Sequence, residues 1–408
     1  MNILMLSATF PYPPTRGGTS VRTFNLLKYL KQQGHQVTLA TLRTGDVTDS
    51  EIAELKDWVD SLAVFPRPLE DDQISGPAGK AARWVNFVAN GVPPSVMASH
   101  SPEMQAWVTE QITSGQFDAI TCEHSVNEVY VPADIGRYIP KSVVNIHSSV
   151  YGTCVHQLAG GTAEKPWRDR LTLPLLKRYE QHYCQKFSHL VVTTAEDKEQ
   201  MAALSGKSEI SVISNGVDLD MFPPRPQDPG GHCLVFIGAM DNLPNIDAVT
   251  FLSKEILPLV RQRYPQVTLS LVGARPTPAV KALADLPNVK VTGKVPAMMP
   301  YLHNSTVCVI PMRTGYGIKN KTLEAMAAGI PVVASDRGLE GLTVEGDGMP
   351  LRALRANTAD DYAEVITRLF ESPQLRQTLS KNGRELIEQE YTWVIAGNRY
   401  EQVLLDPV

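Results

Sequence analysis

The sequence has few cysteines, and it has no apolar run long enough to span a membrane. Its five cysteines are scattered and include no Cys-x-x-Cys pair, so neither a zinc site nor a disulfide framework is expected. No apolar stretch reaches the roughly 18–20 residues of a membrane-spanning helix. The apolar start, residues 3–6, enters a proline-rich turn without a basic leader, which predicts a first strand and no signal peptide. We therefore expect a cytoplasmic protein with reduced thiols.

An excess of charge of either sign is also missing. The 38 lysines and arginines nearly balance the 43 acidic residues, for a formal net charge of -5, so bulk attraction to nucleic acid is not expected. The Gly-x-Gly-x-x-Gly pattern of dinucleotide enzymes is absent. No cluster of metal-ligating side chains stands out either. The sequence thus predicts neither a metal site nor a required cofactor.

What the sequence does contain is a long alternation of short apolar runs with segments of helical spacing. The first such unit is a strand over 3–7, a glycine-rich loop, a helix over 21–30 and a strand over 37–42, which together make a βαβ unit. Further strands are expected over 119–122, 142–146, 190–193, 210–213, 234–238, 267–272, 289–292, 307–311 and 331–335, and further helices over 167–187, 248–263, 322–328, 359–371 and 375–390. The alternation predicts an α/β protein with parallel sheets.

The chain is too long for a single core, since cores usually split beyond roughly 250–300 residues. A proline- and glycine-rich run at 223–231 is the best candidate for a linker. We predict two Rossmann-like domains facing each other across a cleft, where a ligand would bind at the carboxyl ends of strands. The expected divisions are 1–220 for the first domain, 221–388 for the second, and 389–408 for a helix that crosses back to the first.

Two glycines, Gly17 and Gly18, stand just before the first expected helix. Thr19 or Ser20 is the expected N-cap of that helix. Glycines let a backbone approach a phosphate closely, and a helix N-terminus favours negative charge. A tight turn that needs a positive φ would explain the same pair, so both interpretations stay open from the sequence.

The densest motif lies at 311–335, where a strand ends and a helix begins. Three cations, Arg313, Lys319 and Lys321, gather at the strand's carboxyl end, and together with a helix N-terminus they suit a diphosphate. Glu324 follows Lys321 by about one helical turn, and its carboxylate can accept hydrogen bonds from ribose hydroxyls. The alternative is a solvated Lys/Glu helix face, which the apolar neighbours of Glu324 disfavour.

This motif resembles the donor-binding signature of retaining glycosyltransferases of family 4, which have the GT-B fold, and in particular bacterial exopolysaccharide sugar transferases. Motifs at 213–218, 236–241, 272–273, 291–293 and 391–393 extend the resemblance over most of the chain. It implies transfer of a sugar, with retention, from a nucleotide diphosphate sugar (a UDP- or GDP-sugar) to a hydroxyl acceptor, in polysaccharide, glycolipid or glycoconjugate synthesis. The first domain would face the acceptor, and the second would bind the donor.

The resemblance also assigns residues to the site. The donor-binding positions are Gly17, Gly18, Gly238, Asn245, Gly293, Lys294, Val295, Arg313, Tyr316, Gly317, Asn320, Thr322, Leu323 and Glu324, and the catalytic ones are His147, Lys319 and Lys321. Backbone around 293–295 would recognise the base. His147 would lie beside the donor sugar, although a lone histidine after a strand is also a common structural residue. The same two interpretations apply to the Glu123–His124 pair.

Two departures from the family pattern concern charge. The family usually has a glutamate eight positions before Glu324, with seven residues between the two, where it holds a sugar hydroxyl; this chain has Tyr316 there. It also often has an arginine and a lysine where this chain has Ala239 and Asn245. A diphosphate in a crevice needs fixed positive charge. We therefore hypothesise that the lysines at 319 and 321, with Arg313, supply the missing charge.

One helix raises the question of membrane contact. It is expected over 167–187 and carries Arg168, Arg170, Lys177, Arg178 and Lys186. A basic amphipathic face suits peripheral contact with the inner face of a membrane, and similar enzymes act on lipid-linked acceptors. Interleaved acids favour a plain solvated helix instead.

Two other functions stay open from the sequence. A sugar-nucleotide epimerase with two such domains would bind the same donor, but it needs several acid/base carboxylates around the sugar. A degenerate transferase would only bind a sugar, a nucleotide or a partner, and the uncharged Ala239 and Asn245 favour it.

Overall fold

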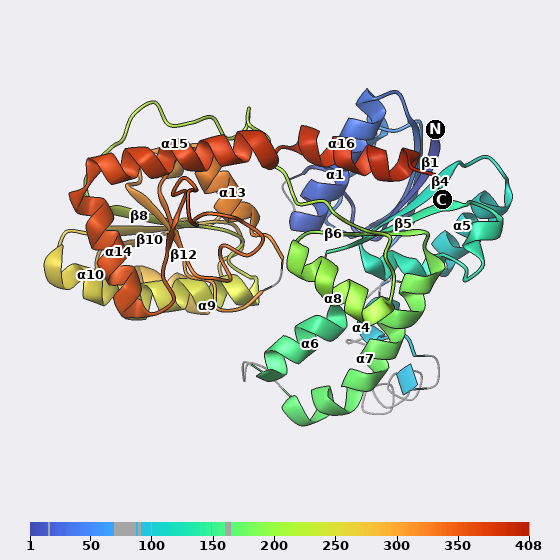
Figure 1. Ribbon diagram of the computed structural model, residues 1–408, viewed down its shortest axis with the longest axis horizontal. Helices are drawn as coiled ribbons and strands as arrows, with labels where there is room; N and C mark the ends of the chain where they lie inside the picture. The colour runs from blue at the N-terminus through green and yellow to red at the C-terminus, as the bar shows by residue number, and fades with distance from the viewer. Residues whose placement is uncertain are drawn as a thin grey trace. The chain divides into compact units, whose positions relative to one another are not determined.

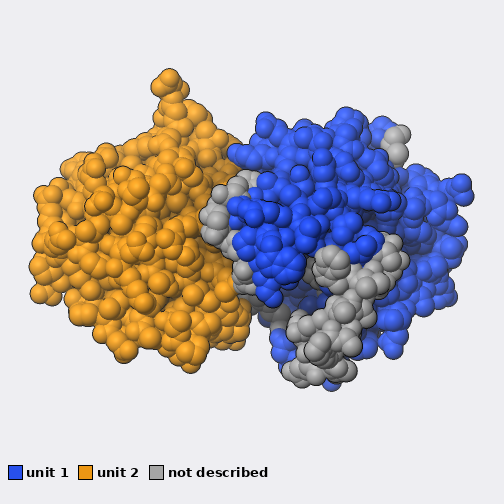
Figure 2. All heavy atoms as spheres, turned by 90° about the horizontal axis from the view of Figure 1, so that it is seen from below, with its two compact units in different colours: residues 1–213, 396–408 blue, residues 214–395 orange. Residues whose placement is uncertain are grey.

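The computed structural model describes residues 1–14, 17–68, 87–88, 91–98, 100–147, 149–159, 165–315 and 317–407. The chain folds into two compact units, which Figure 2 colours blue and orange. Unit 1 comprises Met1–Ile213 together with Ala396–Val408, and unit 2 comprises Ser214–Ile395.

Unit 1 is built on a seven-stranded sheet in the order β3-β2-β1-β4-β5-β6-β7. All neighbouring strands run parallel, and Ile3 lies opposite both Val37 and Ala119. The strand β5 is buried along its whole length, as expected of a parallel strand covered on both faces. The strands are β1 (Asn2–Ser7), β2 (Gln36–Arg43), β3 (Ser61–Pro66), β4 (Ala119–Glu123), β5 (Lys141–Ile146), β6 (His189–Val192) and β7 (Ile210–Val212).

The helices of unit 1 connect these strands and pack on the sheet (Figure 1). They are α1 (Gly18–Gln32), α2 (Asp49–Lys56), α4 (Pro94–Met97), α5 (Pro102–Thr113), α6 (Val150–Ala159), α7 (Pro166–Lys186) and α8 (Ala195–Ser205). The last helix, α16 (Trp393–Leu405), begins within the range of unit 2 and continues in unit 1. It packs closely there, since a Cβ added to Gly397 would lie 2.2 Å from Tyr29 Cγ.

Unit 2 has a six-stranded sheet in the order β10-β9-β8-β11-β12-β13, again with every neighbouring pair parallel. Its strands are β8 (Cys233–Ile237), β9 (Thr268–Val272), β10 (Val289–Val291), β11 (Val307–Ile310), β12 (Val332–Ala334) and β13 (Leu354–Arg355). The prediction of two Rossmann-like domains with parallel sheets is therefore confirmed.

The helices of unit 2 are α9 (Leu243–Phe251), α10 (Leu257–Arg263), α11 (Pro278–Lys281), α12 (Met299–His303), α13 (Asn320–Ala327), α14 (Ala359–Glu371) and α15 (Pro373–Glu390). The helix expected to begin at residue 248 begins at Leu243, because Pro244 is tolerated in a first helical turn, where its missing N–H has no partner to lose. A π-helical turn, Leu252–Ile256, joins α9 to α10.

The division between the units falls at different residues from those expected. The first boundary lies after Ile213 and the last after Ile395, whereas the sequence suggested 220 and 388. The proline-rich run at 223–231 lies within unit 2, where the Arg225 backbone N–H donates to Ala328 O at 3.0 Å. That contact and the ion pair between Asp228 and Arg376 hold the run against unit 2.

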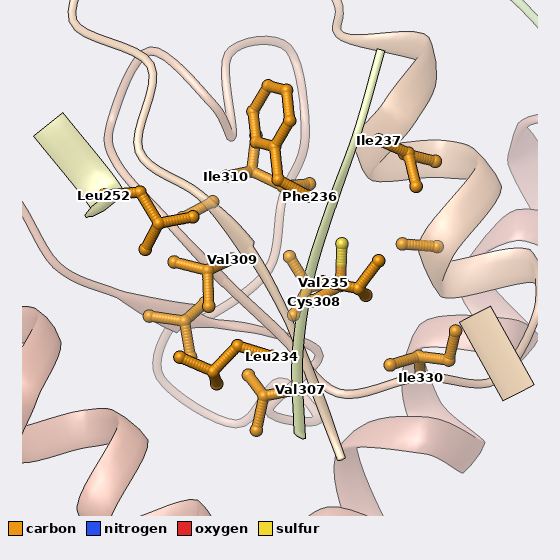
Figure 3. Close-up of a cluster of buried hydrophobic side chains, with 14 of the residues drawn as sticks. Leu234, Val235, Phe236, Ile237, Leu252, Val307, Cys308, Val309, Ile310 and Ile330 are labelled. Atoms are coloured by element: carbon orange, nitrogen blue, oxygen red, sulfur yellow. The ribbon is translucent and has the colours of Figure 1, made fainter. Parts of the chain in front are cut away.

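The core of unit 2 forms around its two central strands. Figure 3 shows side chains of β8 and β11, among them Val235 and Val309, packed together with Leu252 and Ile330. The buried apolar runs that predicted these strands therefore meet in one layer. This packing fixes where the loops after the two strands begin.

Candidate functional site

Each sheet has one place where the strand order reverses. In unit 1 it lies between β1 and β4, and in unit 2 between β8 and β11. The loops that follow such neighbouring strands leave toward opposite faces of the sheet, and ligands bind in the crevice at the strands' carboxyl ends. These two places are where a site is expected in each unit.

In unit 2, Gly238 directly follows β8, and its surroundings leave no room for a larger side chain. Its φ is 153°, and an added Cβ would lie 2.9 Å from Asn245 Nδ2 and 3.3 Å from Lys321 Nζ. The Gly238 carbonyl in turn packs on Gly273, where a Cβ would lie 1.7 Å from that oxygen. The two glycines allow side chains from α9 and α13 to reach the end of β8.

Lys321, in the first turn of α13, extends to this end of the sheet. Its ammonium donates a hydrogen bond to Asn245 Oδ1 and lies 4.8 Å from the centre of the Phe236 ring and 3.7 Å from Met312 Sδ. Asn245 is itself oriented, because its Nδ2 donates to the Ala239 carbonyl at 2.8 Å. An asparagine therefore holds the lysine at the switch point.

Burial perturbs the charges of both Lys321 and Glu324. Together with the nearby charge of Lys319, it lowers the pKa of Lys321 to about 8. It raises the pKa of Glu324 to about 7, against the attraction of Lys321. Among the described residues, none donates a hydrogen bond to the Glu324 carboxylate. Titratable groups perturbed in this way are characteristic of functional sites.

The charge of Lys319 is offset within the protein. Its buried ammonium donates to the Glu340 carboxylate at 3.0 Å and to the Gly317 carbonyl. Glu340 also pairs with Arg337 at 2.9 Å. Of the two lysines, Lys321 is therefore the one whose ammonium lies beside the end of β8.

Arg313 is engaged elsewhere. Its guanidinium forms a two-pronged ion pair with Asp247, at 3.0 and 2.5 Å, and lies over the Phe251 ring with its central carbon 4.7 Å from the ring centre. Both partners are on α9. Arg313 thus braces the loop after β11 against α9, and its charge is already balanced.

The other predicted positions at the start of α13 have mainly structural contacts. Asn320 Oδ1 accepts from Asn215 Nδ2 at 2.8 Å, and the Thr322 hydroxyl donates to the Gly338 carbonyl at 2.7 Å. Leu323 is fully buried in the core. Gly317 has φ 65°, which explains a glycine there. Tyr316 lies outside the described residues.

The segment predicted to recognise the base follows β10. Gly293 has φ 69°, and its carbonyl accepts from the Thr292 hydroxyl at 2.8 Å. Lys294 is exposed, and Val295 packs partly against the core of unit 2. The turn is thus fixed by backbone geometry and by one side-chain hydrogen bond.

In unit 1 the two glycines lie at the start of α1. The N-cap is Gly17, with no side-chain cap, and the helix begins at Gly18, so the expected cap at Thr19 or Ser20 is wrong. Gly17 has φ 161°, an extended conformation, so the position does not require the positive φ of a tight turn. Gly17, Gly18 and Thr19 line a cavity of about 300 Å³ together with Arg67.

His147 follows β5 and lies near α1. Its Nδ1 is 3.4 Å from the Thr19 hydroxyl, and its ring meets that of His124 edge to face, with 4.9 Å between centroids. Burial lowers the pKa of His147 well below its usual value, and it lowers the pKa of His124 to about 4. Both imidazoles are therefore neutral at physiological pH.

Sequence reasoning missed several residues of these sites. Glu340, which neutralises Lys319, lies outside the motif, and Phe236 and Met312, which surround the Lys321 ammonium, look like ordinary strand and loop residues. No local signal identifies them. Asn245 was noted for its lack of charge, whereas its amide is what holds Lys321.

Two family models match the chain. The model described as "Glycosyltransferase Family 4" matches residues 16–221, half of the chain, and the model described as "Glycosyl transferases group 1" matches residues 231–372. A D-inositol 3-phosphate glycosyltransferase from Frankia alni is 28% identical over 228 residues, which are 49% of this chain and 54% of that protein. The chain thus matches about half the length of the first curated relatives.

Other similarities extend over the whole chain. A phosphatidyl-myo-inositol mannosyltransferase from Mycobacterium leprae is 25% identical over 401 residues, 95% of this chain and 92% of that protein. A sucrose-phosphate synthase from Thermosynechococcus elongatus has a TM-score of 0.68 at 18% identity, covering 98% of both chains. Anabaena HepE, solved with UDP, has a TM-score of 0.68 at 14% identity, covering 99% of both. The structural neighbours share the fold, and because the family 4 model spans half of the sequence, the chain belongs to glycosyltransferase family 4.

Proposed function

We propose that the protein transfers a sugar from a nucleotide diphosphate sugar to a hydroxyl acceptor, with retention at the anomeric carbon. The observation that carries the proposal is the ammonium of Lys321, held at the end of β8 beside the N-terminus of α13. A fixed, partly buried cation beside a helix N-terminus suits a leaving diphosphate. We infer a UDP- or GDP-sugar donor and a role in polysaccharide, glycolipid or glycoconjugate synthesis, as in exopolysaccharide transferases.

The proposed roles divide the donor among short segments of unit 2. The diphosphate would meet Lys321 and the first N–H groups of α13, which no side chain caps. Glu324 would accept hydrogen bonds from the ribose, because its carboxylate has no donor among the described residues. The backbone at 293–295 would recognise the base. Lys319 would act indirectly, through the Gly317 carbonyl that it holds.

The chemistry proposed for this arrangement is mainly electrostatic. The acceptor oxygen bonds to the anomeric carbon as the bond from that carbon to the diphosphate breaks, and the hydroxyl proton passes to the diphosphate. Lys321 would stabilise the charge that builds on the leaving oxygen. A bound diphosphate favours the protonated amine, so the pKa of Lys321 would rise from about 8 when the donor binds.

Two measurements test this function. Thermal-shift screening of UDP, GDP, ADP and TDP should single out one nucleotide, since a ligand that binds the native state raises its stability. Incubation with a panel of the matching nucleotide sugars then separates three outcomes. Nucleotide release that depends on an added hydroxyl acceptor supports transfer. Interconversion of the donor sugars would instead indicate an epimerase, and binding without either reaction would indicate a degenerate transferase.

We further propose peripheral contact of α7 with the cytoplasmic face of a membrane. Trp167 and Leu171 lie four residues apart, on one face of the helix, and are 67% and 61% exposed. Exposed cations accompany them: Lys165, Arg168, Arg170, Lys177 and Arg178. Lys186, which the sequence placed on this face, instead pairs with Glu128 at 2.5 Å and is excluded from it. Among the described helices, none is both long and apolar enough to cross a bilayer.

Vesicle binding tests this contact. The protein should sediment with vesicles that contain anionic phosphatidylserine more than with neutral phosphatidylcholine vesicles, and the double variant Trp167→Ser, Leu171→Ser should lose that difference. Leu243→Ser, which removes a 70% exposed leucine from unit 2, is the matched control. Equal sedimentation of the double variant and the wild type would refute the proposed contact.

A further inference from the structure

Two histidines of unit 1, His124 and His147, closely follow a pair of buried polar residues. Glu123 is the last residue of β4 and directly precedes His124. Asn145 lies opposite Glu123 in the sheet register and precedes His147 by two residues. Glu123 and Asn145 are thus neighbours on adjacent strands, one residue before His124 and two residues before His147.

These two residues belong to a network that reaches the C-terminal helix. The Tyr400 hydroxyl of α16 donates to Glu123 Oε1 at 2.7 Å. Asn145 Nδ2 donates to Glu123 Oε2 at 3.1 Å and to the Tyr400 oxygen at 3.0 Å. Arg22 of α1 donates from Nη2 to Asn145 Oδ1 at 3.1 Å. All four side chains are at most 2% exposed.

Such a network is costly to bury unless every member is satisfied. Burial raises the pKa of Glu123, and the hydrogen bond from Tyr400 and the charge of Arg22 lower it again. Apolar side chains would fill the same space without that cost. A buried polar network instead fixes one geometry, here among α1, β4, β5 and α16.

The backbone of His124 needs such support. Its φ is 107°, which is sparsely populated for a residue with a Cβ and persists where surrounding contacts hold it. Its ring is also oriented, because Nδ1 accepts from the Val126 N–H at 3.3 Å. In a neutral imidazole this leaves the proton on Nε2. His147 Nδ1 is held near the Thr19 hydroxyl.

We propose that Tyr400 is a positioning residue for His124 and His147. Its hydroxyl fixes the Glu123–Asn145 pair, and that pair fixes the ends of β4 and β5 from which the imidazoles project. The importance of this for catalysis rests on the proposed function and on the expectation from the sequence that His147 lies beside the donor sugar.

The position of Tyr400 in the chain gives the network a second consequence. The helix α16 that carries it starts at Trp393, within the range of unit 2, and the preceding Thr392 forms a bridge with Val217 of unit 2. Tyr400 itself is anchored in unit 1. The helix α16 thus begins in unit 2 and carries Tyr400 in unit 1.

Histidine NMR tests the proposal without any substrate. Protein labelled with ¹³C and ¹⁵N in histidine is compared between wild type and Tyr400→Phe, with ring signals assigned from His124→Gln and His147→Gln. We expect the signals of both histidines to shift or split in Tyr400→Phe, and His124 to lose its single Nε2-protonated form. Unchanged signals for both histidines would overturn the proposal.

A matched variant separates positioning from a general effect on α16. Tyr29→Phe removes another hydroxyl contact to this helix, because the Tyr29 hydroxyl donates to Glu401 Oε2 of α16 at 3.5 Å. Glu401 Oε1 in turn lies 2.8 Å from His35 Nε2. We expect it to shift the His35 signal and to leave the other two unchanged. A Tyr29→Phe variant that perturbs His124 and His147 as much as Tyr400→Phe would also overturn the proposal.

A second variant covers poor folding of Tyr400→Phe. Glu123→Gln keeps the shape of the side chain but replaces one acceptor oxygen by a donor, so it should give the same pattern of histidine shifts. In either variant, the affinity for nucleoside diphosphate should stay within about twofold of wild type, because that site lies in unit 2. The NMR comparison needs no substrate, so it would still test the positioning role of Tyr400 if the proposed transfer reaction proved wrong.

Discussion

Replacing Lys321 by methionine should weaken nucleotide binding and, at the same time, stabilise the free protein. The ammonium lies in an apolar surround of Phe236 and Met312, with Asn245 as its hydrogen-bond acceptor. Methionine has a similar length and flexibility and carries no charge to desolvate. If Lys321 serves ligand binding at the expense of folding stability, its replacement should lower the affinity for nucleotide and raise the stability of the free protein.

The magnitude follows from the pKa. Burial lowers the pKa of Lys321 from its usual 10.5 to about 8, and each pH unit corresponds to about 1.4 kcal/mol. Keeping the lysine protonated therefore costs the folded protein about 3 kcal/mol at neutral pH, as an upper bound on the gain from methionine. The loss of a charge-assisted contact to a diphosphate costs about 1.5–3 kcal/mol, or a roughly 10- to 100-fold weaker Kd.

The sign of the pH dependence follows from the same shift. Between pH 8 and 10.5 the unfolded chain holds a proton that the folded Lys321 has lost, so wild-type stability rises with pH in this window. The methionine variant lacks that rise. Its advantage in melting temperature over wild type should be largest below pH 8 and fall toward zero near pH 10.5.

Calorimetry with UDP and GDP and thermal unfolding from pH 7 to 10.5 measure both effects on the same samples. Lys281→Met, an exposed lysine in the same unit, is the control and should change neither. If the lysine variant bound nucleotide as tightly as wild type, Lys321 would not be the diphosphate cation. A clearly lower melting temperature at pH 7 would show that the ammonium instead stabilises the fold.

Three further substitutions test neighbouring parts of the argument. Burial raises the pKa of Glu324 from 4.5 to about 7, so the folded protein loses stability as pH rises through that window. In thermal unfolding, Glu324→Gln should abolish this loss. The same variant should bind nucleoside diphosphate about tenfold more weakly, and its binding of pyrophosphate, which has no ribose, should be unchanged. Gly238→Ala places a Cβ 2.9 Å from Asn245 Nδ2 and should weaken nucleotide binding at least about tenfold in calorimetry, with an unchanged circular dichroism spectrum. Gly397→Ala places a Cβ 2.2 Å from Tyr29 Cγ and should cost about 1–3 kcal/mol of stability in urea unfolding, while nucleotide affinity in unit 2 stays the same.

The structure changes the hypothesis about where the missing positive charge comes from. The sequence suggested three cations after β11, but Arg313 is balanced by Asp247 and Lys319 by Glu340. Only the third, Lys321, reaches the end of β8. It does so at Asn245, one of the two positions where relatives often carry a cation of their own, so a lysine on α13 and an asparagine on α9 together occupy that place.

The sequence by itself determined most of the secondary structure and the location of the cation-rich motif at 311–335. Strands such as β1 and β11 consist almost entirely of apolar residues, which is the pattern typical of parallel strands buried on both faces. The strand Ser61–Pro66 was missed because it lies only partly buried at an edge of its sheet, and β13 because it has only two residues. Local patterns report burial of a segment, and edge strands carry little of that signal.

Only the tertiary structure decided which of the candidate residues act together. Spacing along the chain placed three cations in one loop, but the partners that neutralise two of them lie 66 residues before Arg313 and 21 residues after Lys319. The link from Tyr400 to Glu123 spans 277 residues. Ion pairs and buried hydrogen bonds depend on distances in space, which strand order and helix packing set. The sequence shows which charged residues are present, and the fold determines which of them are paired within the protein and which one is placed to contact a ligand.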